Sequence, residues 1–226
     1  MCPFCYLGKR KFEKALEAFP EREKIQLERK SFELMPDLRP GQAVDLQEML
    51  VETKGMAMEQ VKAMNAQLAE AGKQIGIDFN FENALGTNTR YAHRLIQLAK
   101  AHGKGDRAEE LLFKAFFTQG RHIGDIPTLI GLGAEMGLDP GEVRTVLESD
   151  AYGGEVERDI QEARQVGVRG VPFFVLDGKY AISGAQEPDI FLGALEKSFG
   201  EWQERNPQPT FEILEGKSCS PEGHCE

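Results

Sequence analysis

Hydrophobic residues recur at helical spacing along most of the chain. Four apolar residues between positions 12 and 19 share one helical face, so a helix is predicted from Pro3 to Phe19, and Pro20 ends it. Residues 25–34 alternate in polarity and predict a strand. The middle of the chain is rich in good helix formers. It predicts helices at residues 43–50, 58–75, 88–102, 106–119, 126–136, 142–148 and 152–166.

The period of the pattern changes after Gly167. Residues 171–176 form an apolar run that predicts a buried strand, and residues 179–183 predict its partner strand. Asp177-Gly178 between them is a strong signal for a tight hairpin turn. A last amphipathic helix is predicted at residues 188–199. The prolines and glutamates that follow Gly200 predict an extended tail.

The composition is that of an ordinary globular protein of 226 residues, 41% hydrophobic and 28% charged. With 27 Lys and Arg against 37 Asp and Glu, the net charge of −10 disfavours binding to nucleic-acid phosphates or to anionic lipid. No apolar run approaches the roughly 20 residues that span a membrane. No secretory leader, phosphate-binding loop or dinucleotide motif is visible. We therefore expect a cytoplasmic protein that binds neither nucleic acid nor membranes.

The four cysteines fall in two pairs at the two ends of the chain, Cys2 with Cys5 and Cys219 with Cys225. They are too few for a disulfide-built scaffold. Cys2 would lie at the N-terminus of the first helix, where free N–H groups and the helix dipole stabilise a thiolate. Cys5 follows one turn later, near enough to attack a mixed disulfide. The Cys2–Cys5 pair favours redox catalysis over a structural disulfide or half of a zinc site.

A helix that opens with such a pair usually follows a buried strand, and the numbering leaves no room for one before Cys2. We expect that upstream residues, including this first strand, are missing from the numbering. With that strand, the two ends of the chain complete an α/β thioredoxin fold that a large all-helical insertion interrupts. The predicted domains are a discontinuous thioredoxin-like domain (residues 1–40 and 165–199), the helical insertion (41–164) and a C-terminal tail (200–226).

The second candidate site is Gly170-Val171-Pro172, which leads into the apolar strand. The Val171–Pro172 bond is a candidate cis peptide. A cis-proline loop opposite the cysteine pair would present the backbone of Val171 to an extended peptide, which can add as a strand. An ordinary trans proline at a strand start is the alternative, and the presence of the cysteine pair favours the cis bond.

Four stretches, in order, resemble FrnE-like proteins of the DsbA family of thioredoxin-fold dithiol oxidoreductases. They are residues 2–10 at the active-site helix, 88–95 at a helix start in the insertion, 167–175 at the cis-proline loop and 183–186 at the following turn. The resemblance extends from residue 2 to about residue 199 and also implies a first strand before the helix. It implies that Cys2 is the nucleophile, Cys5 the resolving thiol and Pro172 a cis residue.

Two departures from related proteins refine this expectation. Isomerases of 2-hydroxychromene-2-carboxylate keep the fold, carry Ser in place of the cysteine pair and bind glutathione, whereas this chain keeps both thiols. Phe4 stands where strongly oxidising DsbA proteins carry His. We therefore expect a less oxidising couple, because the reduced form lacks that additional stabilisation.

Cys219 and Cys225 enclose five residues, including Pro221 and Gly223, and can close a small disulfide loop. We predict that this pair acts as a redox relay or regulator of the Cys2–Cys5 pair. A passive clasp of the tail and zinc binding are the alternatives. The four cysteines would suffice for zinc in number, but the five-residue gap exceeds the usual spacing of two to four.

The predicted function is a protein thiol–disulfide oxidoreductase or isomerase with Cys2 and Cys5 as catalytic residues. Val171 and Pro172 are expected to bind substrates, which are proteins or peptides with thiols or disulfides. We expect no metal or other cofactor, and glutathione or a protein thiol would reset the pair. The alternatives are a glutathione-dependent isomerase or transferase of the same fold, and a zinc-binding or chaperone-like module. His93 is interpreted as a structural partner.

Overall fold

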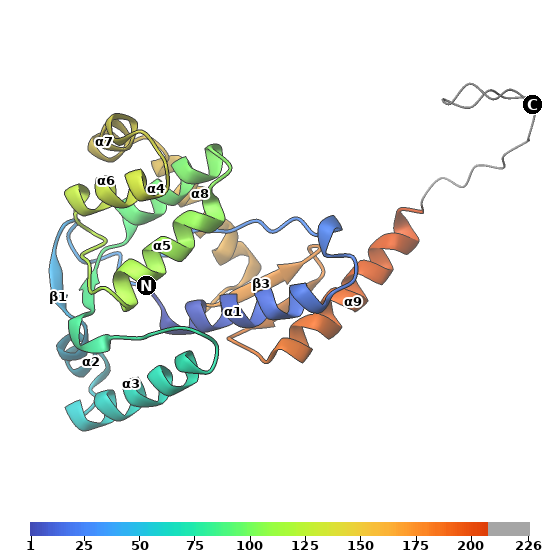
Figure 1. Cartoon of the computed structure of the whole chain (residues 1–226), viewed down its shortest axis with the longest axis horizontal. Coiled ribbons are helices and arrows are strands. Elements are labelled where there is room, and N and C mark those ends of the chain that lie inside the picture. The colour runs from blue at the N-terminus through green and yellow to red at the C-terminus, as the bar shows by residue number, and fades with distance from the viewer. Residues whose placement is uncertain (208–226) are drawn as a thin grey trace, which may run out of the picture.

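The computed structural model describes residues 1–207, whose elements form two groups (Figure 1). Helices α2 to α7 form the first group. The second consists of α1, α9 and the hairpin β3–β4, and α8 leads along the chain from the first group to the second. In chain order the elements are α1 Pro3–Ala18, β1 Ala43–Asp45, α2 Leu46–Lys54, α3 Met58–Lys73, β2 Leu85–Thr87, α4 Arg90–Ala101, α5 Gly105–Phe117, α6 Ile126–Glu135, α7 Pro140–Glu148, α8 Gly153–Val166, β3 Phe173–Leu176, β4 Tyr180–Ser183 and α9 Pro188–Arg205.

The first group is built around α4, which contacts α5, α6, α7 and α8. Leu95 and Leu98 of α4 are completely buried. Phe116 and Phe117 of α5 are also completely buried, and their rings meet edge to face with centroids 4.7 Å apart. Most helices of this group lie within a few residues of their predicted bounds, because each carries an apolar stripe that its neighbours bury.

The start of the first group differs from the prediction. Residues 43–45 form strand β1, which pairs antiparallel with β2 in the register Ala43↔Thr87, whereas the sequence predicts a helix from residue 43. Helix α2 begins only after Asp45, whose carboxylate accepts hydrogen bonds from the N–H groups of Gln47 and Glu48. Asp is strongly favoured at a helix N-cap and is a poor helix former in a helix interior, so the helix begins after this residue.

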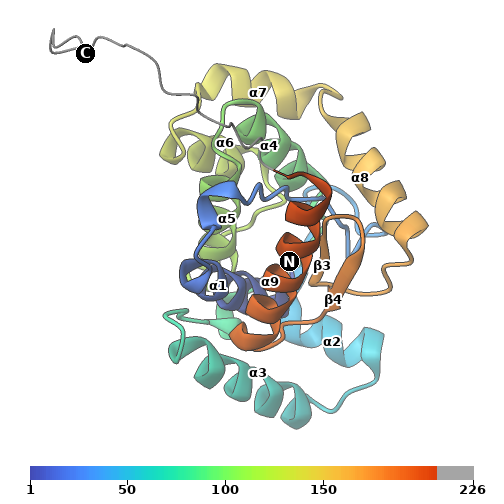
Figure 2. The ribbon, with the colours of Figure 1, turned by 90° about the vertical axis from the view of Figure 1, so that its right-hand side faces the viewer.

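The second group has its own aromatic core. The ring of Phe12 in α1 lies 5.6 Å from that of Phe174 in β3 and 5.7 Å from that of Phe191 in α9. The hairpin next to α9 is confirmed (Figure 2). Its turn residues Asp177 and Gly178 have φ of 51° and 64°, the left-handed region that a tight hairpin turn requires.

Helix α9 continues to Arg205, so residues 200–205 are helical and do not belong to the predicted extended tail. The ring of Trp202 stacks on Phe199 with centroids 5.7 Å apart. Glu201 forms an ion pair with Lys179 and accepts a hydrogen bond from the hydroxyl of Tyr180. These contacts attach the last turns of α9 to the hairpin. The local sequence pattern does not show this attachment, because it depends on residues about 20 positions apart.

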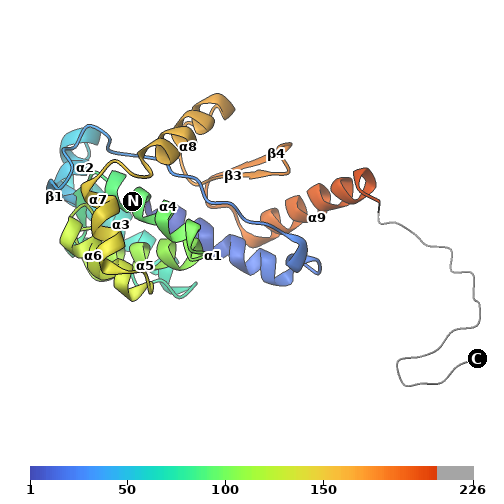
Figure 3. The same cartoon turned by 90° about the horizontal axis from the view of Figure 1, so that it is seen from above.

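Residues 25–34 cross from the end of α1 towards β1 without regular secondary structure (Figure 3), so the predicted strand is wrong. A strand needs a neighbour for its backbone hydrogen bonds. Within residues 1–207, β3 pairs only with β4, and residues 25–27 and β3 jointly line a cavity of about 470 Å³ instead of pairing. The N–H of Ser31 donates to the carboxylate of Asp159 at 2.8 Å in place of a ladder bond. The first strand predicted before Cys2 has no counterpart in this part of the chain.

An ionic cluster connects the two groups between α1 and α5. Glu110 of α5 accepts a hydrogen bond from the Tyr6 hydroxyl at 2.6 Å and pairs with Lys9 at 3.1 Å and with Arg10. Lys9 is buried and also pairs with Glu13. Because a buried ammonium group needs partners, this cluster fixes α1 against the first group. Among the described helices, none is both long and apolar enough to cross a bilayer.

Candidate active site

The first site is the N-terminus of α1, where Cys2 is the N-cap and Pro3 the first helical residue. Proline is favoured here because its missing N–H would have no partner in a first turn. The N–H of Cys5 donates to the carbonyl of Cys2 at 3.1 Å, which closes the first turn and brings both sulfur atoms to one side. Both cysteines are half-buried and present as free thiols, and Phe4 between them is 46% exposed.

The second site is the loop before β3, and it lies directly beside Cys2. The Val171–Pro172 peptide bond is cis, as expected from the sequence. The Cys2 thiol donates to the carbonyl of Val171 at 3.6 Å. On the other side of the loop, the N–H of Gly184 donates to the carbonyl of Pro172 at 2.8 Å. The hairpin therefore holds the proline loop against the start of α1.

Gly8 permits this close approach, and the sequence analysis did not identify it. A Cβ atom on Gly8 would lie 3.0 Å from Cγ of Pro172 and 3.4 Å from Cζ of Phe174. The loop packs onto the backbone of α1 at the position that is one helical turn after Cys5. A glycine inside a predicted helix, where it costs stability, is the signal that could have pointed to it.

The two thiols differ strongly in acidity. A hydrogen bond from the Cys5 thiol lowers the pKa of Cys2 to about 6, with help from the N–H groups of Cys5 and Phe4 and against the effect of burial. The same hydrogen bond, which is lost on ionisation of Cys5, combines with burial to raise the pKa of Cys5 far above its usual range. At pH 7 a group with a pKa of about 6 is about nine-tenths ionised. The Cys2 thiolate thus accepts from Cys5, while the Cys2 thiol donates to Val171.

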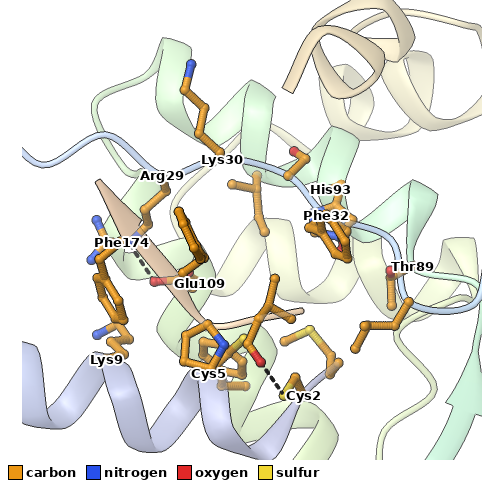
Figure 4. A pocket seen from close by; sticks show the side chains of 18 of the residues that line it. Cys2, Cys5, Lys9, Arg29, Lys30, Phe32, Thr89, His93, Glu109 and Phe174 are labelled. Carbon is orange, nitrogen blue, oxygen red and sulfur yellow. Dashed lines mark hydrogen bonds and ion pairs between the residues drawn. The ribbon is translucent and has the colours of Figure 1, made fainter. Parts of the chain in front are cut away.

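A cavity of about 220 Å³ opens beside the cysteine pair (Figure 4). Its walls come from α1, residues 27–34, α4, α5 and the loop and strand at residues 171–174. Apolar side chains such as Phe32 and Ile96 line much of it. Lys9, Arg29 and Glu109 add charged groups to the same cavity. The sequence analysis did not identify Arg29 and Glu109, because no motif or spacing in the sequence relates these two residues to Cys5.

Asn88 and His93 have structural contacts. Asn88 donates to the carbonyls of Pro36 and Leu38, at 3.2 and 2.9 Å, and accepts from the N–H of Arg90 at the start of α4. His93 lies in the cavity wall, and its Nε2 donates to the carbonyl of Phe32 at 3.1 Å. Asn88 directly precedes Thr89, the N-cap of α4, and its side chain connects the first residue of this helix to the loop at residues 36–38.

Cys219 and Cys225 lie outside the described residues. Within residues 1–207, no group of three or more His, Cys, Asp or Glu side chains is arranged to hold a metal ion.

Known proteins share both the sequence and the architecture of this chain. The probable DsbA oxidoreductase SCO1869 from Streptomyces coelicolor is 35% identical, with a TM-score of 0.85 over 100% of this chain and 94% of that one. The uncharacterized protein YwbO of Bacillus subtilis is 28% identical over 197 residues, which cover 86% of this chain and 91% of the relative.

A more distant structure shares the fold. The cytosolic disulfide reductase DsbM from Pseudomonas aeruginosa is 18% identical, with a TM-score of 0.61 over 89% of this chain and 95% of that one. The sequence matches the family described as DsbA-like thioredoxin domain over residues 1–196, which include the cysteine pair, the helical region and the cis-proline loop. The predicted thioredoxin-type fold with a helical insertion is thereby confirmed, and the chain belongs to the DsbA-like thioredoxin-domain family of disulfide oxidoreductases and isomerases.

Proposed function

We propose that this chain is a thiol–disulfide oxidoreductase that acts on proteins or peptides, with Cys2 as the nucleophile. The observation that carries the proposal is the position of Cys2, whose pKa of about 6 supplies thiolate at neutral pH. Its sulfur lies 3.6 Å from the carbonyl of Val171 in a cis-proline loop. The thiolate is the reactive form in disulfide exchange.

In the reductive direction, the Cys2 thiolate attacks one sulfur of a substrate disulfide and displaces the other as a thiolate. The new Cys2–substrate bond is made with a lone pair of the Cys2 thiolate, and the departing thiolate takes the electron pair of the original disulfide bond. Cys5 loses its proton and attacks the Cys2 sulfur, which forms the Cys2–Cys5 disulfide and releases the second substrate thiolate. The substrate gains two electrons and the cysteine pair loses them. Glutathione or a protein thiol reduces the pair again.

The backbone of Val171 is the proposed docking point for the substrate. Its carbonyl faces Cys2, and its N–H has no hydrogen-bond partner within residues 1–207. An extended peptide can exchange backbone hydrogen bonds with both groups while its cysteine reaches Cys2. Leu34, which is 44% exposed and lines the same cavity as Val171, supplies apolar surface near this position, and Phe4 between the two cysteines is 46% exposed.

The proposal is tested by trapping the mixed disulfide with a disulfide-bonded peptide. Cys5→Ser should accumulate a Cys2–substrate adduct that peptide mass mapping locates, and Cys2→Ser should abolish both the adduct and the reduction of protein disulfides. A Cys2→Ser protein that still reduces the peptide would overturn the assignment. Turnover of a glutathione-dependent small-molecule isomerisation without disulfide exchange would favour the isomerase alternative.

The tail cysteines belong to a separate part of the proposal. We propose that Cys219 and Cys225 exchange with the Cys2–Cys5 pair. A disulfide between Cys219 and Cys225 would close a loop over five residues, and Cys2, with a pKa of about 6, can attack such a disulfide as a thiolate at neutral pH. In the absence of substrate, Cys5→Ser should then form an adduct between Cys2 and a tail cysteine. A truncation after residue 216 should change the redox poise while the core stays folded. No adduct and unchanged activity would instead indicate a passive clasp.

A further inference from the structure

Helix α4 begins in the wall of the cavity beside Cys2, and its N-cap residue is Thr89. A threonine at an N-cap normally accepts a hydrogen bond from an N–H group of the first turn. The Thr89 hydroxyl makes no such bond, and the N–H of Arg90 donates to the side chain of Asn88 at 2.8 Å. Thr89 is 5% exposed, and within residues 1–207 its hydroxyl has no hydrogen-bond partner. This hydroxyl is therefore free to bond a group inside the cavity.

His93 supplies a second polar atom one helical turn later. Its N–H donates to the carbonyl of Thr89 at 2.9 Å, so the two side chains share one face of α4, and both line the cavity (Figure 4). A carbonyl only accepts, so Nε2 of His93 carries the proton in its bond to Phe32. Burial lowers the pKa of His93 to about 4, so the ring is neutral at pH 7. Its Nδ1 is then an acceptor without a partner in the described chain.

The cations that line the cavity each have a carboxylate partner. The pairs are Lys9 with Glu13, Arg29 with Glu109, and Lys30 with Glu162. Phe32 and Ile96 contribute apolar surface to the same wall as Thr89 and His93. A charged ligand group would find no unpaired opposite charge among these residues. A neutral group that both donates and accepts would satisfy the two free polar atoms of α4.

We propose that Thr89 and His93 form a polar subsite for a substrate side chain that carries a hydroxyl or an amide, two positions from the reacting cysteine. Such a side chain accepts from the Thr89 hydroxyl and donates to Nδ1 of His93. Successive side chains of an extended peptide point to opposite sides, so residues two positions from the cysteine lie on its side. The cavity of about 220 Å³ has room for them, because a water in the liquid occupies only about 30 Å³. This inference rests on the proposed function and names the substrates that the site prefers.

The test compares disulfide-bonded peptides that differ only in the residue two positions before or after the cysteine, with the full-length reduced protein. Threonine and valine have similar shapes, so this pair of peptides isolates the hydroxyl. At one of the two positions, kcat/KM should be about 10-fold higher for threonine, because valine leaves buried polar groups unpaired. Thr89→Val should reduce this ratio to about 2-fold or less, whereas Thr89→Ser, which keeps the hydroxyl, should retain most of it.

Thr145→Val is the matched control, because Thr145 lies on the exposed surface of α7 and its hydroxyl donates to the carbonyl of Gly141 at 2.9 Å. It should leave the ratio unchanged. The ratio compares two substrates of one protein, so a general loss of stability or activity in a variant cancels. The inference is overturned if the unmodified protein reduces both peptides equally at both positions, or if Thr89→Val leaves the ratio unchanged. Failure to reduce any of the peptides would instead contradict the proposed function.

Discussion

At the scale of single residues, the hydrogen bond between the two thiols sets the difference in acidity between Cys2 and Cys5. The helix N-terminus contributes through the N–H groups of Phe4 and Cys5, but the Cys5 thiol contributes more. The two cysteines are thus one electrostatic unit. The Cys5 thiol lowers the pKa of Cys2 and thereby activates it, and Cys5 itself later attacks the mixed disulfide that Cys2 forms.

The first prediction concerns the pKa of Cys2 in two variants of Cys5. Cys5→Ala removes the hydrogen-bond donor, so the pKa of Cys2 should rise from about 6 towards the ordinary value of about 8.5. Cys5→Ser keeps a hydroxyl donor and should keep most of the depression. The measurement is the pH dependence of Cys2 alkylation, read by peptide mapping to separate Cys2 from the tail cysteines. Equal values for both variants would show that the helix N-terminus acts alone.

The second prediction concerns the fit of the proline loop on Gly8. Gly8→Ala places a methyl group 3.0 Å from Pro172, so the loop should shift at a cost of about 1–3 kcal/mol. The KM for peptide disulfides should rise while the pKa of Cys2 stays unchanged. Gly193→Ala is the control, because no atom lies within 4 Å of the new methyl group in α9. It should stabilise the helix by about 0.5–1 kcal/mol without an effect on KM. Similar behaviour of the two variants would contradict the packing argument.

At the scale of elements, residues 25–34 show how a strand pattern is realised only when a neighbouring strand is available. The alternation suits a pleated surface, yet these residues and β3 line cavities together and make no ladder. Leu27 and Leu34 remain 42% and 44% exposed, and Val175 of β3 is 51% exposed. Within residues 1–207, the edge of β3 that faces away from β4 has no strand partner.

The third prediction is a difference in hydrogen exchange along β3. The bond from Gly184 N–H to Pro172 O makes residues 172 and 184 a bonded pair, so the alternation of an antiparallel ladder makes Phe174 and Ile182 the next one. The amides of Phe173 and Val175 should therefore exchange much faster than that of Phe174. Amide exchange measured by NMR tests this. Equal protection of Phe174 and Val175 would mean that the outer edge of β3 is paired in solution.

At the scale of the whole molecule, the site lies between two hydrophobic cores. One core fills the helical group and includes Leu95 and Phe116, and the other joins α1, α9 and the hairpin and includes Phe12 and Phe191. The cavity beside Cys2 takes residues from both groups, so the catalytic geometry depends on how the groups are held together. The Lys9–Glu110 cluster is one of the contacts that hold the two groups together, and the bond from His93 to Phe32 attaches the segment 25–34 to the first group.

The fourth prediction is a loss of stability on acidification that depends on His93. Burial lowers the pKa of His93 to about 4, against an ordinary value of about 6.5. Between these values the unfolded chain binds a proton that the folded chain does not, so the free energy of unfolding should fall by about 3 kcal/mol from pH 6.5 to pH 4. Urea unfolding at several pH values measures this change.

The matched variants are His93→Gln and His102→Gln. His93→Gln should lose this part of the pH dependence, whereas His102→Gln should retain it, because His102 is exposed and pairs with Glu142 on the surface. An unchanged acid profile in His93→Gln would assign the loss of stability to the carboxylates.

The features that depend on near neighbours in the chain can be predicted from the sequence. The helix from Pro3, the turn at Asp177-Gly178 and the pairing of the two cysteines within one helical turn follow from local periodicity and turn chemistry. The position of the cis Val171–Pro172 bond beside Cys2 was also predicted, although only the matching motifs related these distant stretches.

The features that depend on contacts between distant parts of the chain became visible in the folded structure alone. Residues 25–34 remained without a ladder because strand formation requires a second backbone at hydrogen-bonding distance. The place of Gly8 at the site is visible only from the proline ring that packs on it. The place of Glu109 is visible only from the cavity that it shares with Cys5. The acidity of Cys2 likewise depends on burial and on the geometry of the Cys5 thiol. Packing brings these groups together, and no local pattern of residues encodes their distances.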